Sequence, residues 1–190
     1  MTWYAQFGED EWIVNNLQIP EHGYFVEIGV GLDGLLHSNS KYLEDIGWEG
    51  LLIEADPDLI EIIKSNRKSQ VLNFAITDYV GTVNFIQHHR NKELSGILRA
   101  EVDGTSIRVP CTTIEKLLNK NKHIDLMSID TEGSEVSILN CIGEIRPSIL
   151  IVEYETDGLG NFFQQVLDKL VSMGYKSVHQ TRCNIIAVPA

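Results

Sequence analysis

Short apolar runs alternate along the chain with segments whose apolar residues have helical spacing. The apolar runs predict buried strands over residues 24–30, 50–56, 70–76, 123–130 and 148–155. Helices are expected over residues 12–17, 38–47, 57–67 and 161–174, several of them bounded by glycine, proline or a capping-type serine. Strands that alternate with helices of this length predict crossover connections and a mainly parallel sheet.

Two segments depart from this alternation. Residues 175–180 and 183–189 predict a closing hairpin, which would add an antiparallel strand to the sheet. Residues 79–110 place a polar, glycine-dotted stretch between two strand-like stretches, which predicts a small antiparallel insertion after the third strand. We expect residues 1–190 to form a single domain with this insertion. Its ligand should bind at the carboxyl ends of the parallel strands.

The composition narrows the choice of partners. The 190 residues carry a formal net charge of -12, and so acidic a surface disfavours binding to a nucleic-acid backbone. We expect no membrane span, because no run reaches about 18 apolar residues, and no secretion signal at the start. Cys111, Cys141 and Cys183 are scattered and odd in number, which is typical of free thiols in the cytoplasm. Both a monomer and a homodimer are compatible with these features.

The stretch "YFVEIGVGLDG" (residues 24–34) ends a predicted strand in a glutamate and then supplies three glycines. Gly29, Gly31 and Gly34 fit the pattern GxGxxG, which is informative here because it follows a strand and precedes a predicted helix. Glycine permits a positive φ and lets a ligand approach the backbone. The pattern therefore predicts a turn that binds a nucleoside-type ligand.

Two acidic residues bear on the choice between a dinucleotide and S-adenosylmethionine, and a third indicates a nucleoside-type ligand without choosing between them. Glu27 and Asp33 lie beside the glycines, where they would repel a pyrophosphate but suit a cationic amino-acid portion such as that of S-adenosylmethionine. Glu54 ends the second strand and is expected to accept hydrogen bonds from ribose hydroxyls of either ligand. A nicotinamide-dependent oxidoreductase is the alternative, although the short chain and the hairpin tail disfavour it. A non-catalytic interaction module with the same fold is a third interpretation.

Several segments together resemble one family over nearly the whole chain. They are "QFGEDEWIVNNL", "FVEIGVGLDGLLHSNSKYLEDIGWEGLLIEADP", "NFAI", "VPCTTIEKLL", "IDLMSIDTEGSEVSILN" and "RPSILIVEYE". The sequence resembles the FkbM family of S-adenosylmethionine-dependent methyltransferases. The resemblance implies the class I methyltransferase (Rossmann-like) α/β fold, a three-layer sandwich around a seven-stranded sheet whose last strand is antiparallel. It also implies O-methylation of a hydroxyl on a sugar or small natural product, and thus a small-molecule or glycan acceptor.

The resemblance also implies which residues bind the cofactor. Besides Glu27, Gly29, Gly31 and Glu54, it adds Asp33, Gly34, Ser38, Asn39, Ala55, Ala75 and Asp130. Many family members have proline at the position of Ala55, and this departure leaves the rest of the pattern intact. Gln6, Glu9 and Asp10 are expected to cover the methionine end of the cofactor.

A second acidic group, in "SIDTEGSE", supplies the candidate chemistry. Asp130 ends the fourth strand and, by the resemblance, borders both the transferred methyl group and the acceptor. Either Asp130 or Glu132 is the expected general base, with His88 from the insertion as a further catalytic candidate. Glu132, Glu153 and Ser95 are expected to contact the acceptor. The carboxylates of Asp130, Glu132 and Glu153 could also hold Mg²⁺ or Ca²⁺, although orienting sugar hydroxyls is an equal use for them and no metal ligand set is assigned.

Overall fold

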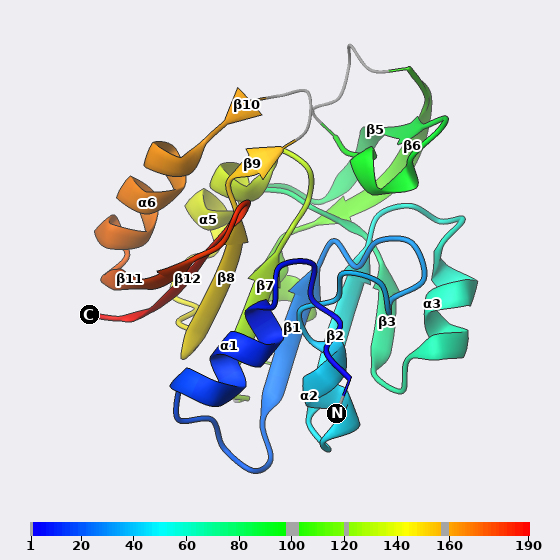
Figure 1. Ribbon diagram of the computed structural model, residues 1–190. Coiled ribbons are helices and arrows are strands. Elements are labelled where there is room, and N and C mark those ends of the chain that lie inside the picture. Colours follow the sequence, from blue (N-terminus) through cyan, green and yellow to red (C-terminus); the bar gives the residue numbers. More distant parts are fainter. Residues whose placement is uncertain (1, 98–102, 120–121, 157–159) are drawn as a thin grey trace.

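The computed structural model describes residues 2–97, 103–119, 122–156 and 160–190. Seven strands form its main sheet: β1 (Tyr24–Ile28), β2 (Glu49–Glu54), β3 (Gln70–Asn73), β7 (Leu126–Ile129), β8 (Ile149–Glu153), β11 (Tyr175–Gln180) and β12 (Asn184–Pro189). Their order across the sheet is β11-β12-β8-β7-β1-β2-β3 (Figure 1). Neighbouring strands are parallel except that β12 is antiparallel to both β8 and β11. The predicted sheet, with its antiparallel strand in a C-terminal hairpin, is confirmed.

Helices cover both faces of the sheet and make a three-layer sandwich. One layer contains α1 (Glu9–Asn16), α2 (Lys41–Asp45) and α3 (Ile60–Asn66), and the other contains α4 (Ile114–Leu117), α5 (Glu135–Cys141) and α6 (Phe163–Ser172). β1 serves both layers, because side chains alternate across a strand. Phe25 packs in the core beneath α1 to α3, whereas Val26 and Ile28 pack beneath α4 to α6. Glu27 therefore points to the same face as Phe25.

A small second sheet stands beyond β3 and appears in green in Figure 1. It is formed by β4 (Ala75–Ile76), β5 (Gly81–His88) and β6 (Gly104–Thr112), with β5 and β6 antiparallel. The short helix η1 (Lys92–Leu94) lies between β5 and β6, and residues 98–102 of the expected insertion lie outside the described residues. A further pair of strands, β9 (Glu155–Thr156) and β10 (Gly160–Asn161), follows β8.

Three predicted boundaries were wrong. The expected strand over residues 70–76 is divided, because the Asn73 side chain donates to the carbonyls of Glu54 and Ala55 and the chain then crosses into the small sheet as β4. α3 begins after Pro57, at Ile60. The glycine turn does not enter a helix directly, since α2 begins only at Lys41. In the described ranges no helix is long and apolar enough to cross a membrane.

Candidate active site

A pocket of about 300 Å³ lies at the carboxyl ends of β1, β2, β7 and β8. This is the edge where open parallel sheets bind ligands, and the volume is that of a small-molecule site. Its polar wall includes Glu27, Asn39, Ser128, Asp130 and Glu153. Its apolar wall includes Ala55, Phe74, Ala75, Ile76 and Ile97, contributed by the end of β2, the β3–β4 segment and the insertion. The pocket therefore offers an apolar end and an acidic end.

The first two glycines of the turn have different tasks. Gly29 has φ 80°, and a Cβ placed on it would lie 1.5 Å from the backbone oxygen of Asp130. Gly29 is thus required for the close approach of β1 to the end of β7. Gly31 has φ 70° and lines the pocket. A Cβ placed on it would have no described atom within 4 Å. Both glycines line the pocket, but only the second has open space where a side chain would stand.

Glu54 is buried and holds the glycine turn in place. Its carboxylate accepts hydrogen bonds from the amides of Val30 (3.0 Å), Gly31 (3.1 Å) and Asp56 (2.7 Å). Burial raises the pKa of Glu54, and the three amide donors oppose that shift because they favour the charged form. The residue lines the pocket, and a carboxylate has about four lone-pair sites, so acceptor capacity remains for ribose hydroxyls.

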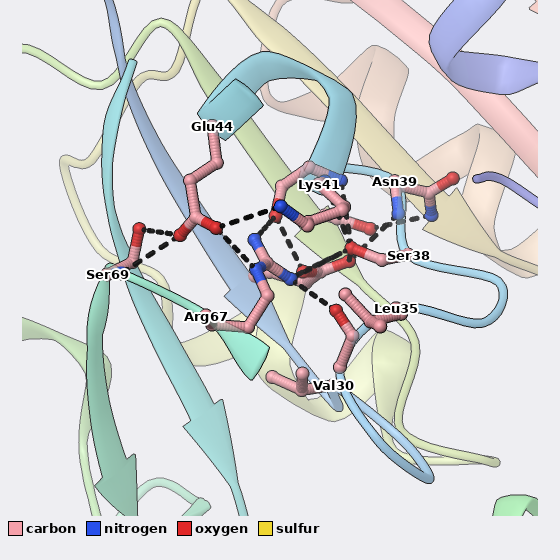
Figure 2. Close-up of polar contacts among 12 residues, drawn as sticks. Val30, Leu35, Ser38, Asn39, Lys41, Glu44, Arg67 and Ser69 are labelled. Carbon is pink, nitrogen blue, oxygen red and sulfur yellow. Dashed lines mark hydrogen bonds and ion pairs between the residues drawn. The ribbon is translucent and has the colours of Figure 1, made fainter. Parts of the chain in front are cut away.

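The carboxylate of Glu27 is bound within the protein. It accepts hydrogen bonds from the hydroxyl groups of Ser38 (3.0 Å) and Ser40 (2.7 Å) and from the amide of Asn39 (2.9 Å). Arg67, at the end of α3, donates to it at 3.4 Å and compensates its charge. Figure 2 shows this network between Arg67 and the segment that carries Ser38 and Asn39. Glu27 lines the pocket, but it is not the free negative charge that the sequence suggested.

Arg67 is the residue that sequence reasoning missed. Its side chain is fully buried and pairs with Glu44 as well as Glu27. It also donates to the backbone oxygen of Gly34 at 2.8 Å and to the hydroxyl of Ser40 at 2.8 Å. A basic residue at a helix end is ordinarily a solvated partner of the helix dipole, so only its burial reveals this role.

The side chain of Asn39 indicates whether the pocket suits a nucleoside with an amino-acid portion. It is 4% exposed and lines the pocket, and its Nδ2 donates to the hydroxyl of Ser128 at 3.0 Å. Among the described residues no group donates a hydrogen bond to its Oδ1. Buried polar atoms are nearly always paired, so this oxygen fits a donor on a ligand, such as an ammonium group. The residues present therefore fit a ligand that carries both ribose hydroxyls and an ammonium group, as S-adenosylmethionine does.

Three carboxylates gather at the acidic end of the pocket. Asp130, Glu132 and Glu153 each bring an oxygen within 4.8 Å of the others. Burial, and after it the charge of Glu135, raises the pKa of Asp130 to about 7. Burial and the charge of Asp130 likewise raise the pKa of Glu153. A carboxylate with such a pKa takes up a proton readily near neutral pH.

The turn that carries Glu132 is unusual in its backbone. Glu132 has φ 59°, in the left-handed region that non-glycine residues seldom adopt. The neighbouring Glu135 is buried and accepts hydrogen bonds from the amides of Thr131 (2.7 Å) and Gly133 (3.1 Å). Glu135 thus maintains the turn, and the strained conformation of Glu132 marks a position held by its surroundings, as is common at functional sites.

The insertion forms part of the pocket wall and is tied to the main sheet. Lys92 pairs with Asp56 (3.2 Å) and Asp58 (3.1 Å), which follow β2. Glu93 lies 2.9 Å from Nδ1 of His37, a residue of the glycine-turn segment with φ 62°. Asn91 to Ile97 all line the pocket, Ser95 among them. Ser95 was expected to contact the acceptor and does line the pocket, whereas the other residues of this stretch were not predicted to cover the site.

Several predicted site residues do not line the pocket. His88 accepts hydrogen bonds at Nδ1 from the amides of Arg90 and Asn91, so it closes a turn, and its assignment as a catalytic base is not supported. Asp33 accepts from the amides of Leu35 and Leu36 instead of facing the ligand.

The cofactor assignments of two further residues change in the same way. Gly34 contributes a carbonyl oxygen to Arg67, and Ser38 a hydroxyl group to Glu27. Neither residue lines the pocket. Both contribute to the support of the pocket and not to its surface.

The N-terminal segment reaches the site at its polar end. Gln6 lines the pocket. Glu9 is buried and accepts hydrogen bonds from Thr181 and Asn184 near the closing hairpin, both at 2.8 Å. Asp10 accepts from the amide of Tyr4 at 2.7 Å. Glu9 and Asp10 therefore hold this segment in place, and Gln6 is the member of the predicted group that meets the cavity.

The sheet order and the antiparallel β12 are those of the class I methyltransferase fold, and the pocket lies at the carboxyl edge of its parallel strands. The chain belongs to the methyltransferase FkbM domain family, whose model matches residues 27–177. This finding decides between the two expected ligand classes in favour of S-adenosylmethionine and against a nicotinamide cofactor. It also identifies the chain as an enzyme.

Solved structures share the fold at low sequence identity. Methyltransferase FkbM from Methylobacillus flagellatus KT has a TM-score of 0.60 at 12% identity, covering 97% of this chain and 48% of that chain. A TehB-like SAM-dependent methyltransferase from Corynebacterium glutamicum has a TM-score of 0.53 at 14% identity, with 96% and 86% covered. Precorrin-6y C5,15-methyltransferase from Geobacter metallireducens GS-15 has a TM-score of 0.53 at 11% identity, with 95% and 87% covered. A search of curated protein sequences gives no match.

Proposed function

We propose that this enzyme methylates a hydroxyl group of a sugar or small natural product. The observation that carries the proposal is that Asp130, Glu132 and Glu153 meet in the same pocket as the glycine turn and Glu54. Carboxylates accept hydrogen bonds from hydroxyl groups, and closely spaced carboxylates repel an anionic acceptor. A neutral polyhydroxyl acceptor therefore suits the acidic end of the pocket.

The protein contributes alignment and proton removal. S-adenosylmethionine supplies a methyl group that is already electrophilic because it is bonded to a sulfonium. Alignment of two reacting groups contributes roughly 7–11 kcal/mol, and the carboxylates of Glu132 and Glu153 orient the acceptor hydroxyl. As the hydroxyl oxygen gains the methyl group, its proton passes to a carboxylate oxygen of Asp130. Glu132 is the second candidate for this base.

The pKa of Asp130, raised to about 7 by burial and by Glu135, suits that role. The base must be deprotonated before it accepts the proton, so kcat should increase as pH rises through about 7. In Asp130→Asn this limb of the pH profile should disappear and kcat should fall by roughly 10²–10⁴-fold, the usual contribution of general-base catalysis.

The test is transfer of an isotope-labelled methyl group to a panel of sugars and phenolic or aliphatic alcohols, each paired with its deoxy analogue. We expect transfer to at least one hydroxyl compound and none to its deoxy partner. Asp130→Asn and Glu132→Gln are compared with Glu21→Gln, an exposed carboxylate outside the pocket. Full turnover of both pocket variants would place the base elsewhere, and transfer to amines alone would overturn the hydroxyl assignment.

The same assay separates this role of the carboxylates from the binding of a divalent cation. The three oxygens are spaced closely enough to ligate Mg²⁺ or Ca²⁺. If the carboxylates orient the acceptor and take its proton directly, removing divalent cations with a chelator leaves kcat unchanged. Loss of activity that added Mg²⁺ restores would assign them to a metal instead.

A further inference from the structure

The Asn39 carboxamide lies at a defined place relative to the ribose site. Its Nδ2 donates to the hydroxyl of Ser128 on β7, whereas Glu54 ends β2. β7 and β2 flank β1 on opposite sides. Asn39 therefore lies on one side of β1 and Glu54 on the other.

The apolar wall fixes the direction of a bound nucleoside. Ala55, Phe74 and Ala75 lie at or beyond the end of β2, where a planar base packs against apolar groups. With its ribose at Glu54, the nucleoside points its base toward this wall and its opposite end toward β7. The donor that meets Asn39 Oδ1 then belongs to the end of the ligand remote from the base.

The chain on both sides of Asn39 is held by Arg67. The Asn39 amide donates to Glu27 Oε1 at 2.9 Å, and Arg67 pairs with Oε2 of the same carboxylate. Arg67 also donates to the hydroxyls of Ser38 at 3.1 Å and Ser40 at 2.8 Å. Figure 2 shows the Asn39 side-chain oxygen turned away from this network. The network fixes the backbone of Asn39, which lines the pocket, and does not engage that oxygen.

We propose that Arg67 is a positioning residue for cofactor recognition, which holds Glu27 and residues 38–40 so that Asn39 Oδ1 accepts a hydrogen bond from the cofactor's ammonium group. The inference rests on the S-adenosylmethionine dependence in the proposed function and not on the identity of the acceptor, because it requires an S-adenosyl amino acid in the pocket. Glu27 then acts through the Asn39 backbone and not as the direct partner of the ammonium group. The direct recognition residue is Asn39.

The test uses calorimetry with two ligands, S-adenosylhomocysteine and 5′-methylthioadenosine, which shares the nucleoside but lacks the amino-acid portion. Asn39→Ala should weaken S-adenosylhomocysteine binding about tenfold, the loss of one charge-assisted hydrogen bond. Its affinity for 5′-methylthioadenosine should stay at the wild-type value. Arg67→Lys should show the same ligand-selective loss, because lysine lacks the planar fork that reaches several acceptors.

A double-mutant cycle distinguishes positioning from general support of the fold. If Arg67 acts through Asn39, Arg67→Lys causes no further loss in the Asn39→Ala background. If Arg67→Lys does not fold, Ser40→Ala, which removes a smaller part of the network, takes its place in the double-mutant cycle. Lys64→Met is the matched control on α3, because Lys64 pairs with Glu61 in solvent and should leave both affinities unchanged.

Each contrary result has a distinct meaning. Losses that multiply in the double variants, or equal losses with both ligands, overturn the positioning role. Wild-type affinity of Asn39→Ala for S-adenosylhomocysteine overturns the assignment of the ammonium partner. If the wild-type protein binds neither ligand, the cofactor assignment fails and this inference fails with it, whereas a failure of hydroxyl methylation alone leaves it standing.

Discussion

Exchanging each of the first two glycines of the turn for alanine should separate their tasks. In Gly29→Ala the new Cβ would lie 1.5 Å from the Asp130 backbone oxygen, so β1 and β7 must separate. A left-handed φ costs a non-glycine residue about 1–2 kcal/mol, and overpacking typically adds about 1–3 kcal/mol. The free energy of unfolding should therefore fall by about 2–5 kcal/mol, a large part of the roughly 5–15 kcal/mol of a typical domain.

Gly31→Ala has the same backbone penalty but no clash. Its φ is 70° and its Cβ would meet no described atom within 4 Å, so the loss should be only about 1–2 kcal/mol. The added methyl group would occupy pocket space beside the ligand and should weaken S-adenosylhomocysteine binding about tenfold, which corresponds to about 1.4 kcal/mol.

Urea denaturation gives the stabilities, and calorimetry gives the affinities of the variants that fold. Gly81→Ala is the control: Gly81 is exposed in β5, and its Cβ would meet only the Tyr79 ring, at the ordinary contact distance of 3.6 Å. It should change stability by less than about 0.5 kcal/mol. Equal destabilisation by Gly29→Ala and Gly31→Ala, or wild-type affinity in Gly31→Ala, would refute this division of the turn.

Two further predictions concern the carboxylates and the insertion. Because the folded-state pKa of Asp130 is raised to about 7, above its unfolded value, its contribution to stability is present at low pH and is lost as pH rises through about 7. The melting temperature of Asp130→Asn should therefore rise relative to that of the wild type as the pH increases from 5 to about 8. A difference between the two melting temperatures that does not change with pH would contradict this. Lys92→Met removes the ion pairs with Asp56 and Asp58, and the loss of stability should be at most about 1 kcal/mol because these pairs are partly exposed. S-adenosylhomocysteine should nevertheless dissociate several-fold faster from this variant in stopped-flow measurements. An unchanged rate would show that the insertion does not retain the ligand.

The sheet could be predicted because each of its strands is marked by the residues of its own short segment of the sequence. Apolar runs marked the strands, and the polar residues that end them, Glu54 and Asp130, meet at one edge because parallel strands share their direction. The division of the third strand was not predictable, since it depends on the Asn73 side chain binding carbonyls of another strand. Apolar residues stand on both sides of Asn73, and a single polar residue in such a run gives no sign of a change of sheet.

The electrostatics of the site were only partly predictable. The Glu27 carboxylate was expected to suit the cationic amino-acid portion of the cofactor, but Arg67, forty positions further along the chain, pairs with it. Pairing over such a distance leaves no pattern in the sequence. His88 does not line the pocket, and its Nδ1 accepts hydrogen bonds from backbone amides two and three residues away.

The contact of Glu9 with Thr181 and Asn184 bears on how the protein matures during synthesis. These hydrogen bonds join residues separated by 172 and 175 positions, and pairings of such long range form late because the loop must first be closed. Ile13 and Ala5 of the first segment contact residues much nearer in the sequence, so α1 can pack before the C-terminal hairpin has been made. A nascent chain shortened before Thr181 would lack the two side chains that fix the Glu9 carboxylate.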